Sequence, residues 1–176
     1  GIISMGIGLG TIGLGMNNPL IAFLGFSGAL LHVFNHSLFK SLLFFSAGSV
    51  YKRYHTRSID QLGGVIKKMP KTSFFFLIGS LAICGLPPLN RFISEMLIYS
   101  GMFKGLTNGT FYDSILMLFG IISLVFIGGL AIFCFTKVFG VVFLGSPRKE
   151  YKNEISEVSS GMLFPQVLIS LVIIAI

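Results

Sequence analysis

Three ionisable side chains repeat at four-residue spacing within one apolar run: His32, His36 and Lys40. Four residues make slightly more than one helical turn, so on a helix these side chains project from one stripe about 12 Å long. Imidazole and ammonium groups can carry protons, and imidazole exchanges them near neutral pH. Ionisable groups at membrane depth are costly and commonly belong to a substrate, ion or proton path. The stripe therefore predicts a relay for protons or other cations.

Lys40 is the firmest member of this stripe. It lies near the middle of the stretch 30–51, whereas a lysine reaches only about 6 Å and the centre of a bilayer is about 15 Å from water. Lys40 must therefore have a polar partner or a path of internal water. His32 and His36 depend on Lys40 for a role, because a lone histidine near a helix end is often only a satisfied polar group. Zinc or haem binding is the weaker alternative, since the remaining histidine, His55, falls in a loop.

Further charged side chains lie within apolar sequence. Arg91 and Glu95 are four residues apart and can pair on one helix face, either as a structural salt bridge or, at Glu95, as part of the relay. Lys137 either reaches the membrane surface or takes part in ion transfer. The two lone cysteines give no iron–sulfur or zinc framework and are expected to be structural. We therefore expect no metal site and no cofactor.

These residues require membrane helices to position them. The chain has 176 residues, 53% hydrophobic and only 11% charged, whereas soluble domains carry about 25% charged residues. The apolar runs predict an all-α polytopic transmembrane bundle. The expected spans are 1–16, 19–51, 72–103, 111–145 and a short 162–176. Because the pattern begins and ends inside apolar runs, we expect a fragment of a longer polytopic protein.

Two of the expected spans contain sequence that disfavours helix. Gly85-Leu86-Pro87-Pro88 (85–88) breaks the span 72–103, because proline donates no backbone hydrogen bond and restricts the preceding residue. Discontinuous helices are tolerated in membranes where protein or water satisfies the freed backbone. Gly128-Gly129 is a second candidate point for a bend or unwinding. The glycines of 1–16 predict close helix packing rather than a phosphate loop, since no lysine or strand pattern accompanies them.

The net charge of +7 is concentrated in two loops. The loop 52–71 holds six lysine and arginine residues and the loop 146–160 holds three. Two spans separate these loops, so both fall on one side of the membrane, and the positive-inside rule makes that side the cytoplasm. The basic residues thus indicate orientation, and no nucleic-acid partner is expected.

Four ordered stretches resemble the proton-translocating antiporter-like membrane subunits. They are LLHVFNHSLFKSLLFFSAGSVY, RSIDQLGGVIKKMPKTS, GSLAICGLPPLNRFISEMLIY and FTKVFGVVFLGSPR, within 28–148. That family includes the pump subunits of respiratory complex I, the Mrp-type sodium/proton antiporters, and membrane subunits of hydrogenase-4 and formate hydrogenlyase. The details NHSLFKS, GGVIKKMP and FLGSPR are most similar to the hydrogenase-4 and formate hydrogenlyase branch.

The resemblance implies a bundle of about fourteen helices built from two inverted repeats, of which this chain would be the later, C-terminal portion. It implies that His32, His36 and Lys40 lie on the central hydrophilic axis as proton-relay positions. Lys137 would lie on a discontinuous helix near the exit half-channel. The lysine–glutamate pair of the family's first repeat would lie upstream of this chain.

Glu95 matches a glutamate common after the family's proline-rich break. Two neighbouring positions depart from the family pattern: Arg91 stands where glycine is usual, and Met96 where tryptophan is frequent. An arginine beside Glu95 would favour the charged carboxylate and take it out of a relay. The role of Glu95 therefore stays open.

The expected function is proton translocation by the antiporter-like subunit of a membrane-bound hydrogenase or complex I-like oxidoreductase, with no redox centre of its own. The expected location is the plasma membrane of a bacterium or archaeon. Expected partners are other membrane subunits of that assembly, the lipid bilayer, and protons or sodium ions. The alternatives are a stand-alone sodium/proton antiporter module, and a non-transporting structural subunit or truncated gene product.

Overall fold

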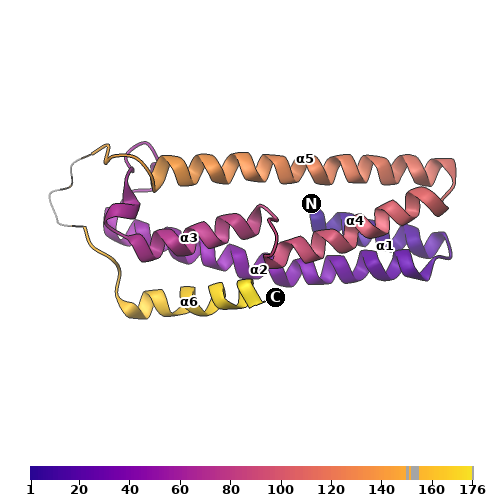
Figure 1. Cartoon of the computed structure of the whole chain (residues 1–176), viewed down its shortest axis with the longest axis horizontal. Coiled ribbons are helices and arrows are strands. Elements are labelled where there is room, and N and C mark those ends of the chain that lie inside the picture. The colour runs from indigo at the N-terminus through magenta and orange to yellow at the C-terminus, as the bar shows by residue number, and fades with distance from the viewer. Residues whose placement is uncertain (150, 152–154, 176) are drawn as a thin grey trace. The chain divides into compact units, whose positions relative to one another are not determined.

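The computed structural model describes residues 1–149, 151 and 155–175. Every regular element in these residues is helical, as the all-α prediction requires. The elements are α1 (Ile2–Gly15), α2 (Pro19–Tyr54), the short 3-10 helix η1 (Val65–Lys67), α3 (Pro70–Ile83), α4 (Asn90–Asn108), α5 (Phe111–Val142) and α6 (Ser160–Ala175) (Figure 1).

The chain divides into two compact units, which we describe separately. Unit 1 comprises Gly1–Ser37 and Gly85–Leu130, and unit 2 comprises Leu38–Cys84 and Ala131–Ile176. Helices α1 and α4 belong to unit 1, and α3 and α6 belong to unit 2. Helices α2 and α5 each contribute to both units.

Within the described residues, two helices, α2 and α5, are long and apolar enough to cross a membrane. They have 36 and 32 residues, so at about 1.5 Å per residue both exceed a hydrocarbon core of about 30 Å. Only 11% of the most apolar window of α5 is buried, against 39% for α2. Most of α5 is therefore available to lipid or to further helices. The shorter apolar helices are α1, α3 and α6. The expected membrane spans and the cytoplasmic side of the loops stay predictions.

A tight turn with two asparagines joins α1 to α2. Asn17 has φ 49°, a left-handed conformation that asparagine tolerates. Its N–H donates to the Leu14 carbonyl at 3.0 Å. The Asn18 N–H donates to the Gly13 carbonyl at 2.9 Å, which completes a Schellman motif and ends α1. Asn18 Oδ1 then accepts from the Ile21 N–H at 3.3 Å and caps α2.

Small residues bring the backbones of α1 and α2 into contact within unit 1. A Cβ added to Gly13 would lie 2.3 Å from the Ala22 nitrogen. One added to Gly25 would lie 2.3 Å from the Gly10 nitrogen. Backbone atoms cannot move aside as a flexible side chain can, so these positions require glycine. The predicted close packing is confirmed there, whereas a Cβ at Gly8 would meet open space.

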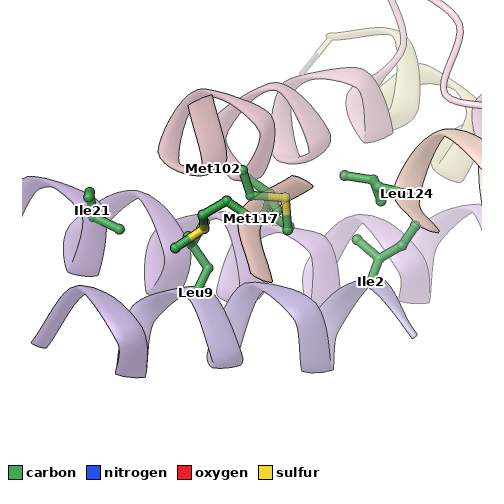
Figure 2. Packing of buried hydrophobic residues seen from close by; sticks show 7 residues of the cluster. Ile2, Leu9, Ile21, Met102, Met117 and Leu124 are labelled. Atoms are coloured by element: carbon green, nitrogen blue, oxygen red, sulfur yellow. The ribbon is translucent and has the colours of Figure 1, made fainter. Parts of the chain in front are cut away.

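The apolar core of unit 1 gathers side chains from α1, α2, α4 and α5 (Figure 2). Its members are Ile2, Leu9, Ile21, Ile98, Met102, Met117 and Leu124. The two methionines pack reciprocally between α4 and α5: Met117 lies 2.8 Å from where a Cβ on Gly105 would stand, and Met102 lies 2.9 Å from one on Gly120. Each flexible methionine thus fills the space over a glycine of the other helix. This packing fixes α4, which carries part of the candidate site.

Helix α5 is continuous from Phe111 to Val142. The unwinding considered at Gly128-Gly129 is therefore wrong for this structure. Two glycines inside a helix cost about 2 kcal/mol relative to alanine. Unwinding inside hydrocarbon would leave backbone groups unsatisfied at several kcal/mol each. The helical state therefore has the lower free energy. A Cβ added to either glycine would have no neighbouring atom within 4 Å, so no contact forces a break in the helix.

The segment between α3 and α4 is not regular helix. Gly85 has φ +72°, a left-handed conformation that follows the end of α3. Leu89 then adopts an extended conformation before the first residue of α4, Asn90. The run 72–103 thus contains two helices, and its irregular residues precede the charged pair of α4.

In unit 2, the loop before α6 is fastened to the start of α3 by Glu157. Its Oε2 accepts from the N–H groups of Lys71 at 2.9 Å and Thr72 at 3.3 Å, and its Oε1 accepts from the Thr72 hydroxyl at 2.6 Å. The first N–H groups of a helix have no intrahelical partner and favour an anion. Glu157 therefore caps α3 from a distant part of the chain.

We predict that Gly25→Ala lowers the free energy of unfolding by about 1–3 kcal/mol, because its methyl group would overlap the backbone of α1. Equilibrium unfolding in mixed detergent micelles, followed by circular dichroism, would measure this change. Gly8→Ala is the matched control and should leave stability unchanged or raise it by up to about 1 kcal/mol. Equal effects of the two substitutions would show that the glycines are not an interface.

Candidate functional site

The ionisable stripe lies on the single helix α2. His32 is buried at 3% exposure, His36 is exposed, and Lys40 is half-buried. The two imidazole rings are neighbours, with centroids 6.4 Å apart. The histidines belong to unit 1 and Lys40 to unit 2, so their relation is the four-residue spacing along α2.

His32 is tied to α4 by a buried hydrogen bond. Its Nδ1 lies 2.9 Å from Ser94 Oγ, and the Ser94 hydroxyl lies 2.8 Å from the Arg91 carbonyl, to which it donates. With the hydroxyl hydrogen used in this way, Ser94 Oγ accepts from the Nδ1–H of His32. Gly28, one turn earlier on α2, allows the approach, because a Cβ there would lie 2.7 Å from Ile98 Cγ1. The ring of His32 is thus held in one orientation.

Two buried asparagines, which sequence reasoning missed, join α2 to the first residue of α4. Asn35 Nδ2 donates to the Asn90 carbonyl at 2.8 Å, and Asn90 Nδ2 donates to Asn35 Oδ1 at 3.2 Å. Asn90 Oδ1 also accepts from the Arg91 N–H at 2.9 Å. Both asparagines have 0% exposure. The available signal was position: Asn35 lies between the two histidines, and Asn90 follows the double proline.

Arg91 and Glu95 form an ion pair on α4, as their spacing predicted. Arg91 Nη2 lies 2.6 Å and Nε 2.8 Å from Glu95 Oε1, and the side chains are only 4% and 13% exposed. Gly85 makes room for the carboxylate, because a Cβ there would lie 2.7 Å from Glu95 Oε2. The carboxylate is therefore neutralised by its neighbour, and a relay role for Glu95 stays untested.

Lys137 is exposed on α5, which is continuous from Phe111 to Val142, so the discontinuous helix that the resemblance implied for Lys137 is wrong for this structure. Within the described part of the chain, neither Lys137 nor Lys40 forms a hydrogen bond or an ion pair. The structure thus brings His32, Ser94 and the asparagine pair together, and leaves both lysine ammonium groups without a described partner. Their proposed roles rest on sequence position.

A second buried polar cluster, also missed from the sequence, joins α2 to α6 in unit 2. Ser46 Oγ donates to Gln166 Oε1 at 2.9 Å, and Gln166 Nε2 donates to Ser49 Oγ at 3.0 Å. All three residues have 0% exposure. A glutamine in an apolar helix gave no spacing pattern, and its partners are more than 100 residues away in the chain.

The helical fold and this polar site are those of a membrane subunit, and the comparisons identify the class. Residues 6–108 match the family described as NADH:quinone oxidoreductase/Mrp antiporter, transmembrane. The match covers more than half of the chain, so the protein belongs to this family and is membrane-bound. The predicted resemblance to antiporter-like membrane subunits is confirmed.

Curated relatives show which members of this family the chain is similar to. The chain is 46% identical over 154 residues to formate hydrogenlyase subunit 3 of Escherichia coli (strain K12), a match covering 87% of this chain and 25% of the relative. It is 39% identical over 173 residues to hydrogenase-4 component B of the same strain, covering 97% of this chain and 25% of the relative. The chain thus spans about a quarter of the length of these relatives.

A solved structure supports the fold. The membrane-bound sulfane sulfur reductase, an archaeal respiratory membrane complex, contains a chain that matches 98% of this one with TM-score 0.67. The match covers 30% of that chain at 20% identity. At this identity the likeness concerns the fold alone, and it supports the predicted all-α membrane bundle.

We predict that Arg91→Met lowers the free energy of unfolding by about 3 kcal/mol, because Glu95 would keep a buried and unpaired charge. The double variant Arg91→Met/Glu95→Gln should recover most of this loss, since no isolated charge remains. Equilibrium unfolding of the four proteins of the double-mutant cycle measures the coupling. Additive losses would contradict a coupled buried pair.

Proposed function

We propose that this protein translocates protons as the antiporter-like subunit of a membrane-bound hydrogenase or complex I-like oxidoreductase. The observation that carries the proposal is the stripe of His32, His36 and Lys40 on α2, with His32 hydrogen-bonded inside the polar cluster shared with α4. The relatives named formate hydrogenlyase subunit 3 and hydrogenase-4 component B favour a hydrogenase assembly. The redox chemistry would belong to partner subunits, and this chain would contribute the ion path.

His32 is suited to a relay because its hydrogen bond persists through protonation. In the neutral ring Nδ1–H donates to Ser94 Oγ, so Nε2 is the basic nitrogen that accepts a proton. In the imidazolium both nitrogens are donors, and the bond to Ser94 remains. A proton can therefore enter and leave without reorganising α4. The neighbouring ring of His36 provides the next acceptor along α2.

Lys40 continues the stripe one turn further and Lys137 is the proposed terminal site. Lys40 is half-buried and has no described hydrogen-bond partner. A positive charge with few polar neighbours responds strongly to other charges, because the local dielectric is low. We propose that charge shifts caused by redox chemistry in partner subunits move protons along Lys40, His36, His32 and internal water.

The proposed location is the plasma membrane of a bacterium or archaeon, with other membrane subunits of the assembly as partners. Both named relatives come from a bacterium. The loops 52–71 and 146–160 are assigned to the cytoplasmic side, because lysine and arginine accumulate on that side of membrane proteins.

We predict that Lys40→Ala in the full-length protein lowers proton uptake by at least about tenfold while the complex still assembles, because the central relay group is lost. Uptake is measured in proteoliposomes with a pH-sensitive dye, and assembly by co-purification of the partner subunits. Lys52→Ala removes an exposed lysine twelve residues after Lys40 on the same helix and should pump normally.

Three outcomes would contradict this function. Normal proton uptake in Lys40→Ala would show that Lys40 is not part of a proton relay. Sodium-dependent transport without any hydrogenase subunits would indicate a stand-alone sodium/proton antiporter module. Neutral behaviour of both Lys40→Ala and Lys137→Ala would indicate a structural subunit or truncated gene product.

A separate prediction concerns the orientation of His32. Ser94→Ala removes the acceptor of the Nδ1–H, which should slow proton uptake about tenfold, whereas Ser94→Thr keeps a hydroxyl and should restore it. The matched control is Ser100→Ala on the same helix, because that hydroxyl donates only to the Met96 carbonyl of its own helix. Equal rates for the alanine variants would show that the Ser94 contact does not serve transport.

A further inference from the structure

Unit 2 contains an apolar cavity of about 210 Å³ that is open on one side. Its walls come from α2, α3 and α5 and include Ala47, Phe76 and Val142. Almost all of the surface that they present to the cavity is carbon. An engineered apolar cavity of about 150 Å³ stays free of water and binds small hydrocarbons. The carbon walls of this open cavity therefore suit hydrocarbon better than a polar ligand.

One guanidinium group lines this cavity, and a second bonds to a residue of its wall. Arg57 lines it and lies over the Tyr51 ring, which also lines it, at 5.0 Å from the centroid. Arg148 Nη1 donates to the carbonyl of Ile59, another lining residue, at 3.2 Å. Neither arginine forms an ion pair with a carboxylate among the described residues. Their positive charges are thus available to an anion beside an apolar cavity.

The cavity lies where the helices meet the cation-rich loops. The Gly64 N–H donates to the Leu144 carbonyl at 2.9 Å, and the Ile66 N–H donates to the Phe143 carbonyl at 3.1 Å. These bonds hold the two loops together beside Phe143, which is also in the cavity wall. Six further exposed cations of this unit lie in or next to the two loops: Lys52, Arg53, Lys67, Lys68, Lys71 and Lys149. Such clusters directly beside membrane helices attract anionic lipid headgroups.

We propose that the cavity binds an anionic phospholipid, with an acyl chain between α2, α3 and α5 and the phosphate on Arg57 and Arg148. Planar guanidinium groups match phosphate oxygens with paired hydrogen bonds. A polypeptide segment is the poorer occupant, because its backbone groups would find almost no polar partner on these walls. The site lies at the loop end of α2 and is independent of the relay proposed above.

The test measures lipid binding to the full-length protein in mild detergent by native mass spectrometry. The probes are phosphatidylglycerol and phosphatidylcholine with identical acyl chains. We expect the first phosphatidylglycerol molecule to bind about tenfold more tightly than phosphatidylcholine, since a hydrogen-bonded charge pair contributes about that factor. Arg57→Gln should abolish this preference. Ala47→Phe, which places a ring in the cavity from an exposed position of its wall, should weaken both lipids.

The matched controls are Lys104→Gln and Val33→Phe. Lys104→Gln removes one exposed charge of α4, which belongs to unit 1 and does not line the cavity, and Val33→Phe adds the same ring at an exposed position of α2 elsewhere. Both should bind the two lipids like the unchanged protein. Thermal unfolding of each variant checks its fold. If Ala47→Phe does not fold, lysophosphatidylglycerol lipids of increasing chain length replace it, and affinity must rise with chain length.

Three results would overturn the proposal. Equal binding of the two lipids would show that the arginines do not select an anionic headgroup. Retained preference in Arg57→Gln would place the headgroup elsewhere. A crosslink from Ala47→Cys to a polypeptide in the purified protein would show that a protein segment occupies the cavity.

Discussion

Hydrocarbon offers no water to a polar group, so each buried polar side chain of a membrane helix must find its partner in protein. The described residues meet this requirement: every buried side-chain nitrogen or oxygen atom among them has a hydrogen-bond partner. Helix α2 contributes to many of these buried hydrogen bonds. Asn35 and His32 bond to α4, and Ser46 bonds to α6. Apolar contacts bring helices together in many registers, whereas these directional bonds select one.

The sequence predicted the features that depend on local pattern. Apolar runs and prolines predicted the helices, and four-residue spacing predicted the ion pair of Arg91 and Glu95. It did not predict Asn90 or Gln166 as buried partners, because uncharged polar residues carry no period and their contacts join distant parts of the chain. It also offered Gly128-Gly129 as a point for a bend or unwinding, but α5 does not unwind there, because exposing backbone to lipid costs more than two glycines in a helix.

The charged groups near the site differ in whether a hydrogen bond or an ion pair holds them. Arg91 and Glu95 neutralise each other and hold a fixed geometry at the start of α4. The ring of His32 is held by Ser94, whereas Lys40 has no described hydrogen-bond partner. A conducting path needs both kinds of group, since a rigid frame keeps distances constant while mobile charge responds to its surroundings. The pair of Arg91 and Glu95 has the fixed geometry that such a frame requires.

The cluster of Gln166 with two serines has a consequence for biogenesis. Helices enter the bilayer in the order of synthesis, so α2 would wait in lipid for α6, its partner more than 100 residues later. Ser49 also donates to the Phe45 carbonyl at 2.9 Å, and Gln166 to the Met162 carbonyl at 2.9 Å. These bonds within one helix can form before the helices meet. Each helix can thus satisfy part of its polar side chains before the two helices meet, and the later docking of α6 then fixes the register of α2.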